Sequence, residues 1–324
     1  MIGVRLCLLG GEGMPLWGFV LCFVIATLWA ASPIMVARGQ SLSNCTSNEI
    51  NPVRSISFFI AALLFALYYT GGHIPAISSP RVFVFLALNV FFSYIIGDIL
   101  YFSAIKEIGI SLAVPVSNTH PMLVALTAWL ILGEKMTFQI IMGILVVMLG
   151  LLLLRFGGAL KSGGDSPVSI GNLSSAKLMR GFLMAIGAAV SWALSAPLIK
   201  LAMVESGLGA VEITFYRAVI FLLLSWGWRF AAVKRSPASV KPFSSLSRAT
   251  VLYFLGAAII GLWLGSVLHA ICIAAMPVAI VTAITATSPF MAALFGHFVL
   301  KERLTRVQWA GVAMIIAGSV TISV

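Results

Sequence analysis

Two ionisable side chains lie inside long apolar stretches of the sequence, where a charge is costly. Asp98 is the only acidic residue deep within such a stretch, and His120 lies near the middle of the next one, directly before Pro121. An ionised carboxylate without a partner in hydrocarbon costs several kcal/mol, and imidazole titrates near neutral pH. The pair therefore predicts a proton or cation relay. The alternatives are an acid that pairs with Lys106 or reaches interfacial water, and a structural histidine bonded to a backbone carbonyl.

A set of polar side chains accompanies Asp98 along the same stretch. Its members are Asn89, Ser93, Tyr94, Asp98 and Tyr101. They recur every three or four residues, as one face of a helix requires, except for the five-residue step from Asn89 to Tyr94. In lipid, such a polar face must lie against protein or a wet cavity.

Other apolar stretches also contain candidate ligands. Trp29 and Trp192 could stack on a substrate, or could pack inside the protein or at the membrane interface. Asn118 and His269 add an amide and a second imidazole. The predicted substrate-binding residues are Trp29, Tyr94, Asp98, Tyr101, Asn118, His120, Trp192, Arg217 and His269.

Arg217 lies within an apolar stretch and has a counterpart in Arg54. Its planar guanidinium could hold a carboxylate or phosphate of a substrate. Snorkelling to the interface and pairing with Glu212 or Glu49 are the alternatives, because both arginines lie within about three turns of a loop.

The residues around these groups indicate an all-α integral membrane protein. Hydrophobic residues make up 61% of the 324 residues and charged residues 9%, which leaves a soluble fold too few polar groups for its surface. A helix needs about 20 apolar residues to cross a bilayer. Such stretches follow one another near 16–37, 53–69, 82–105, 111–132, 138–154, 178–202, 210–230, 250–275, 278–300 and 307–322.

The charge, the cysteines and the motifs argue against a nucleic-acid-binding protein, a disulfide or zinc framework, and an ATP-driven protein. The net charge is +11, but the basic residues lie in loops without an aromatic platform, so we expect anionic lipid rather than nucleic acid as their partner. The four scattered cysteines suggest neither a disulfide framework nor a zinc site. The sequence contains no Gly-x-x-x-x-Gly-Lys-Ser/Thr loop for ATP, and we expect no cofactor.

The sequence repeats itself. A shift of 163 positions places Trp29 on Trp192, and from the third stretch onward a shift of 168 positions places Gly97 on Gly265. Ordered matches among Trp, Pro, Glu, Arg and Gly indicate duplication. An odd number of crossings per copy orients the copies oppositely, so the predicted fold is ten transmembrane helices in two inverted five-helix repeats.

Three motifs recur in the same order in both copies. They are Ser117-Asn-Thr-His-Pro121, Leu132-Gly-Glu-Lys135 and Gly143 with Gly150, then Thr287-Ser-Pro289, Leu300-Lys-Glu-Arg303 and Gly311 with Gly318. This pattern resembles the EamA-type unit of the drug/metabolite transporter superfamily. The resemblance implies a carrier or exporter of metabolites with a central cavity lined by the first four helices of each half. The chain then divides into a tail (1–15), a first copy (16–156), a linker (157–178) and a second copy (179–324).

Some residues of the motifs are expected to be structural. Glu134 and Glu302 should cap and anchor the helix that follows each of them. The paired glycines of each copy lie seven residues apart on one helix face, which allows two helix backbones to approach closely.

The predicted function is secondary transport or export of a small polar or amphipathic metabolite by alternating access, with protons as the candidate coupling ion. We expect a monomer or homodimer, multi-pass in the cell (inner) membrane. A membrane-embedded enzyme would need clustered acids, histidines or nucleophiles at one membrane face. A non-transporting scaffold would need no polar face on its third helix.

Overall fold

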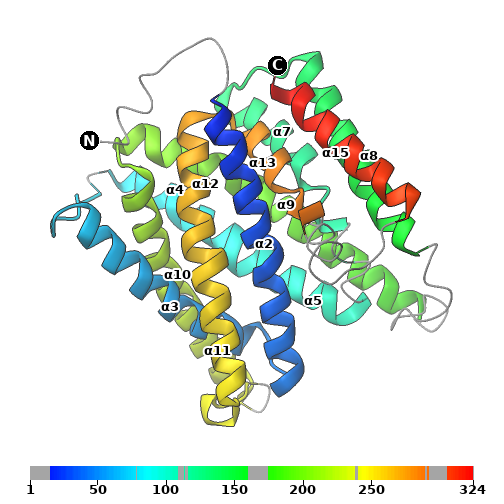
Figure 1. The fold of residues 1–324 in the computed structure, drawn as a ribbon. Helices are drawn as coiled ribbons and strands as arrows, with labels where there is room; N and C mark the ends of the chain where they lie inside the picture. Colours follow the sequence, from blue (N-terminus) through cyan, green and yellow to red (C-terminus); the bar gives the residue numbers. More distant parts are fainter. Residues whose placement is uncertain are drawn as a thin grey trace. The chain divides into compact units, whose positions relative to one another are not determined.

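The computed structural model describes residues 15–77, 79–108, 113, 116–159, 174–237, 240–288, 290–291 and 305–323. Within these ranges every regular element is a helix and no strand occurs, which agrees with the all-helical prediction. The uninterrupted helices (Figure 1) are α2 (Leu16–Ser43), α3 (Ser47–Tyr69), α7 (His120–Leu132), α8 (Phe138–Ala159), α9 (Ser175–Ser206), α10 (Ala210–Arg235), α13 (Val278–Thr285) and α15 (Arg306–Ser323). A short 3₁₀ helix, η4, covers Phe243–Ser245.

Two further long helices each contain a π-helical segment. The first runs through α4 (Pro80–Val90), η1 (Phe91–Gly97) and α5 (Asp98–Ile108), and the second through α11 (Arg248–Ala257), η5 (Ala258–Leu264) and α12 (Gly265–Ala275). A shift of 168 positions superposes the two π-segments to within one residue. A π-helix closes hydrogen bonds between residues five apart and is frequent at functional sites, so the matching positions single out the third helix of each copy.

Six helices are long and apolar enough to cross a membrane among the residues described. They cover Leu16–Ser43, Ser47–Tyr69, Pro80–Ile108, Ser175–Ser206, Ala210–Arg235 and Arg248–Ala275. Shorter apolar helices cover His120–Leu132 and Phe138–Leu153. Ten crossings remain a prediction, because two of the expected stretches, 111–132 and 278–300, include residues outside the described ranges.

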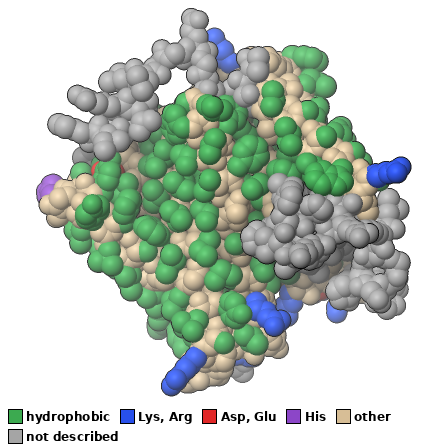
Figure 2. All heavy atoms as spheres, viewed as in Figure 1, with side chains coloured by type: hydrophobic (Ala, Val, Ile, Leu, Met, Phe, Trp, Pro, Cys, Tyr) green, Lys and Arg blue, Asp and Glu red, His purple; other side chains and the backbone are tan. Residues whose placement is uncertain are grey.

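The outward surface of the long helices is apolar. Large hydrophobic side chains such as Leu16, Phe230 and Leu252 are strongly exposed. Figure 2 shows hydrophobic side chains over most of the visible face of the described helices, with few lysines or arginines among them. An apolar surface of this kind is stable in lipid and costly in water.

The described residues form two compact units. Unit 1 contains Thr27–Ile96 and Leu198–Ala275, and unit 2 contains the described parts of Gly97–Pro197, of 10–26 and of Met276–Val324. The copies suggested by the sequence run from 16 to 156 and from 179 to 324. Each compact unit therefore draws segments from both copies.

In unit 1, the second helices of the two copies, α3 and α10, pack against each other. Phe58 and Phe221 occupy matching positions of the repeat, 163 residues apart, and their ring centroids lie 6.4 Å apart in the buried core. Close by, the Ser225 hydroxyl donates to the Ser55 hydroxyl oxygen at 3.0 Å. Contact between equivalent residues is what a two-fold relation between α3 and α10 produces.

In unit 2, the fifth helices, α8 and α15, run side by side (Figure 1). A Cβ atom on Gly150 would lie 2.7 Å from the Gly311 carbonyl oxygen, and one on Gly318 would lie 2.8 Å from the Gly143 carbonyl oxygen. The crossed pairing shows that the two helices are antiparallel. The predicted close packing at these glycines is confirmed.

Glu134 caps a helix, but not the one predicted. Its carboxylate oxygens accept hydrogen bonds from the backbone N–H groups of Val278 at 2.8 Å and Ala279 at 3.3 Å, so Glu134 caps α13 of the other copy. At the start of α8, the helix that follows, the Thr137 hydroxyl accepts from the N–H of Ile140 at 3.2 Å. The corresponding residue, Glu302, lies outside the described residues.

Candidate functional site

Unit 1 contains a buried arginine with polar partners on the third helix of the first copy. Arg217 of α10 is 3% exposed. Its Nε–H donates to Asn89 Oδ1 at 2.8 Å, and its Nη2 donates to the Tyr94 hydroxyl at 2.6 Å. The guanidinium carbon lies 5.0 Å from the centre of the Tyr94 ring. We call Arg217, Asn89 and Tyr94 the arginine cluster.

The π-segment η1 explains why Asn89 and Tyr94 meet the same guanidinium. The two residues are five apart, a step that would separate them on an α-helix and that aligns them where hydrogen bonds span five residues. A side chain from α3 reaches this segment too, because Asn51 Nδ2 donates to the Tyr94 carbonyl oxygen at 3.2 Å. The irregular step in the sequence is thus a property of the π-helix.

The arginine cluster continues through the tyrosine hydroxyl. Tyr94 Oη lies 2.8 Å from Ser266 Oγ. Because Tyr94 accepts from Arg217, its own hydrogen is available for the serine. Phe221 and Phe58 surround the tyrosine, with ring centroids 5.1 Å and 6.0 Å from that of Tyr94. Tyr94 therefore lies among apolar rings, and a surrounding of low polarity strengthens electrostatic interactions.

The two structural roles predicted for Arg217, snorkelling to the interface and pairing with an acid, are both wrong. The side chain is buried within unit 1 instead of snorkelling outward, and both of its hydrogen-bond partners are neutral. Glu49, one of the two acids proposed for pairing, instead forms an ion pair with Arg229, with 3.6 Å between Glu49 Oε1 and Arg229 Nη1. In the described part of the chain, Arg217 Nη1 is buried without a hydrogen-bond partner, and so is Glu212 Oε2.

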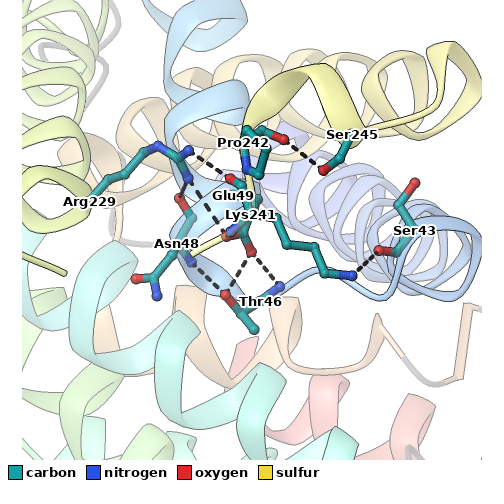
Figure 3. Close-up of polar contacts among 8 residues, drawn as sticks. All are labelled: Ser43, Thr46, Asn48, Glu49, Arg229, Lys241, Pro242 and Ser245. Atoms are coloured by element: carbon teal, nitrogen blue, oxygen red, sulfur yellow. Dashed lines mark hydrogen bonds and ion pairs between the residues drawn. The ribbon is translucent and has the colours of Figure 1, made fainter. Parts of the chain in front are cut away.

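Glu49 organises a second polar cluster of unit 1, drawn in Figure 3. One carboxylate oxygen accepts from the backbone N–H and the hydroxyl of Thr46, both at 2.7 Å, as part of a capping box at the start of α3. The other accepts from the N–H of Lys241 at 2.9 Å. Arg229 also donates to the Asn48 and Lys241 carbonyl oxygens at 3.1 and 2.8 Å. These contacts tie two loops together and identify a structural cluster.

The tryptophans of the two copies occupy matching surroundings. In unit 1, Trp29 lies 4.9 Å from the ring of His269 and donates from Nε1 to the Gly261 carbonyl oxygen at 3.1 Å. In unit 2, Trp192 lies 5.2 Å from the ring of Tyr101. The repeat places Trp29 on Trp192 and Tyr101 on His269, so each tryptophan packs on the ring that the other copy supplies. Trp29 therefore packs against His269 within unit 1.

Unit 2 also contains the predicted relay residues. Asp98 begins α5 and is buried. The ring of His120 lies 5.6 Å from that of Trp192, and its Nδ1 lies 3.2 Å from the Ser117 carbonyl oxygen. Since a carbonyl only accepts, a neutral His120 ring carries its hydrogen on Nδ1 and presents Nε2 as an acceptor. Asn118 lies half-buried in the turn before α7.

The predicted residues therefore fall into two groups. Trp29, Tyr94, Arg217 and His269 belong to unit 1, and Asp98, Tyr101, Asn118, His120 and Trp192 belong to unit 2. All members of the predicted polar stripe, from Asn89 to Tyr101, are buried, as a polar face in lipid requires. Sequence reasoning missed Ser266 and Asn51 as partners of Tyr94. Among the described residues, no group of three His, Cys, Asp or Glu side chains could hold a metal ion.

Comparison with known proteins gives the family. Residues 16–156 and 179–324 each match the EamA-like transporter family. An uncharacterized transporter of Archaeoglobus fulgidus is 27% identical over 292 residues, which cover 90% of this chain and 92% of that protein. An uncharacterized transporter of Clostridium kluyveri is 30% identical over 148 residues, or 43% and 44% of the two chains. A protein of known crystal structure shares the fold, with a TM-score of 0.68 and 17% identity over 94% of this chain and 96% of that one. The chain is thus a multi-pass membrane transporter that belongs to the EamA-like transporter family.

Proposed function

We propose that this transporter is a secondary carrier that moves a small polar or amphipathic metabolite by alternating access. Its two copies would form an inverted pair with ten crossings in total. The observation that carries the proposal is contact between equivalent residues of the two copies, at Phe58 with Phe221 and at the crossed glycines of α8 and α15. A two-fold relation between copies with an odd number of crossings is the architecture of many alternating-access carriers.

Buried polar and aromatic side chains support a polar or amphipathic substrate. Both units hold such groups at positions that the sequence places within apolar stretches, including Tyr94 and Arg217 in unit 1 and Asp98 and His120 in unit 2. Groups of this kind are costly in a membrane unless they have a function or a partner. Alternating access would bring substrate to them from one side of the membrane at a time.

Protons are the coupling ion that we propose, with Asp98 and His120 as the titrating residues. His120 Nδ1 meets the Ser117 carbonyl oxygen, and the imidazole ring packs against Trp192. Neither contact uses Nε2, which is therefore able to accept a proton. Asp98 is the buried acid of the same unit. A carboxylate and an imidazole in one unit could pass a proton through intervening water.

The proposal can be tested on purified protein in liposomes. The metabolite that most stabilises the protein in a thermal-shift screen is first identified. Its uptake as a radiolabelled tracer should be accelerated by unlabelled metabolite inside the vesicles, because a carrier returns faster when loaded. Uptake that is indifferent to the internal metabolite would point to a pore and contradict alternating access.

Asp98→Asn tests the proton coupling in the same vesicles. We expect the variant to lose accumulation driven by a pH gradient while it retains tracer exchange, because exchange needs no net proton movement. Glu205→Gln is the matched control, since Glu205 is an exposed acid at the end of α9 that accepts a hydrogen bond from Ser79 at 2.9 Å. Unchanged gradient-driven uptake in Asp98→Asn would remove this residue from the coupling.

A further inference from the structure

We infer that the arginine cluster binds an oxyanion of the substrate, so the transported metabolite carries a carboxylate or a phosphate. The inference rests on the proposed carrier function and names its substrate class. It starts from the unused donors of a buried guanidinium. Of the five N–H groups of Arg217, Nε donates to Asn89 and Nη2 donates to Tyr94. Nη1 is buried and has no hydrogen-bond partner among the described residues.

The charge of the arginine cluster points to the same ligand. Arginine stays protonated in proteins, and its two partners, an amide oxygen and a hydroxyl, leave the positive charge uncompensated. A buried cation without a counter-ion is costly, and Arg217 is only 3% exposed. A carboxylate or phosphate at Nη1 would supply both the missing acceptors and the missing charge.

The other copy of the repeat lacks these partners. Arg54 takes the place of Arg217 and is equally buried, and its Nη1 donates to Asn51 of its own helix at 3.3 Å. The shift of 168 positions puts Ala257 and Leu262 where the first copy has Asn89 and Tyr94. An arginine needed only for helix packing would be expected to have similar partners in both copies. The two arginines therefore differ in their described hydrogen-bond partners.

Asn89 and Tyr94 fix the direction of the guanidinium. One accepts from Nε and the other from Nη2, so the plane of the fork is held at two points and Nη1 is the nitrogen without a hydrogen-bond partner among the described residues. A held fork loses little rotational freedom when it binds a ligand. Asn89 and Tyr94 thus act as positioning residues for Arg217.

The test uses the full-length protein in nanodiscs and two pairs of probes that differ in charge. The pairs are lactate against lactamide and glycerol 3-phosphate against glycerol. We expect stabilisation by at least one anion and none by its neutral counterpart, and the pair that responds distinguishes carboxylate from phosphate. Stabilisation by the neutral probes alone, or by neither pair, would overturn the inference.

Variants then assign the effect to Arg217. Loss of a charged hydrogen bond should raise the Kd of the anion about ten- to hundredfold in Arg217→Gln. The matched control is Arg54→Gln, which makes the same change at the equivalent position and should leave the Kd within about twofold. If Arg217→Gln does not fold, Tyr94→Phe provides the second measurement. This variant keeps the ring and the charge but removes the hydroxyl that accepts from Arg217, and it should raise the Kd of the anion.

Failure of this inference can be told apart from failure of the carrier proposal. Counterflow of a neutral metabolite that does not depend on Arg217 would leave the carrier standing and reject the oxyanion site. Binding of an anion that depends on Arg217, without any counterflow of that anion, would establish the site and reject the carrier.

Discussion

At the scale of single residues, two arginines of α10 illustrate two uses of one side chain. Arg229 meets the Glu49 carboxylate and two backbone carbonyl groups, so its charge and its donors are satisfied by the fold. Arg217 meets neutral groups and keeps a donor unused. The first arrangement stabilises two loops, and the second is suited to a ligand.

The Glu49 cluster predicts a stability effect that is separate from transport. Glu49→Gln replaces one carboxylate oxygen, an acceptor, with an amide NH₂ group, a donor. Either the N–H of Thr46 or that of Lys241 then loses its acceptor, and Arg229 loses its counter-ion (Figure 3). Because the side chain is fully buried, we expect a loss of about 3 kcal/mol. Thermal unfolding in detergent should show a lower Tm.

Glu107→Gln is the control for this substitution. Glu107 pairs with Arg180 at 3.8 Å, and the two side chains are 25% and 62% exposed. Exposed ion pairs of this kind contribute about 0–1 kcal/mol, so the Tm should scarcely change. Equal shifts in the two variants would contradict a stabilising role for the Glu49 cluster.

Sequence reasoning at this scale was limited by distance along the chain. It placed Tyr94, Asp98 and Tyr101 on one face, because helical spacing is local, and all three are buried. It could not find Arg229 for Glu49 or Ser266 for Tyr94, because these partners are 180 and 172 residues apart. Apolar stretches provide no pattern that sets which helices become neighbours.

At the scale of elements, the closest helix contact is that of α8 with α15. Gly150→Ala would place a Cβ atom 2.7 Å from the Gly311 carbonyl oxygen and 2.9 Å from the Ile315 nitrogen. Backbone atoms cannot move aside as a side chain can, so the helices must separate. We expect a loss of about 1–3 kcal/mol, measured as a lower Tm of the purified protein.

Gly227→Ala is the matched control in a helix. Gly227 lies in α10, and a Cβ atom there would meet nothing within 4 Å. Since alanine favours a helix over glycine, the Tm should be unchanged or higher. A lower Tm for this variant would mean that glycine itself, and not close packing, determines the result at Gly150.

The π-segments are a feature of the helices that the sequence did not predict. The spacing of apolar residues predicted a continuous third helix over 82–105, and the structure has a helix over Pro80–Ile108 that changes type at Phe91 and returns at Asp98. Composition does not distinguish the two helix types. The five-residue step from Asn89 to Tyr94 was the one local sign of η1. The structure explains this step, because both residues accept hydrogen bonds from Arg217.

At the scale of the whole molecule, the inverted pair predicts opposite locations for equivalent loops. His73 and Ser236 are exposed and occupy matching places of the repeat. If each copy crosses the membrane an odd number of times, His73→Cys and Ser236→Cys should react with a membrane-impermeant maleimide from opposite sides of sealed vesicles. Labelling of both from one side would require an even number of crossings and contradict the inverted repeat.

The native cysteines permit this measurement once Cys7 is replaced by serine. Cys22, Cys45 and Cys272 are buried. Burial also raises the pKa of the Cys45 thiol, the Glu49 carboxylate raises it further, and Lys241 lowers it by a smaller amount. The thiol is therefore protonated at neutral pH and unreactive. Variants without an introduced cysteine should give no signal.

The duplication was visible in the sequence, whereas the grouping of its segments was not. Matching Trp and Gly residues revealed two copies, and both copies match the same family. The contact units instead combine Thr27–Ile96 with Leu198–Ala275, and the remaining described segments with one another. Repeat spacing reports common ancestry of segments, and packing is decided by which apolar faces complement each other.

The mixed origin of each unit has a consequence for biosynthesis. A ribosome finishes 27–96 long before it reaches Leu198–Ala275, the segment that completes unit 1. The early helices therefore wait in the bilayer with their future contact faces against lipid, insertion factors or one another. Release of either half as a separate polypeptide would leave both units without part of their interior, and reunion of the halves would be needed to restore them.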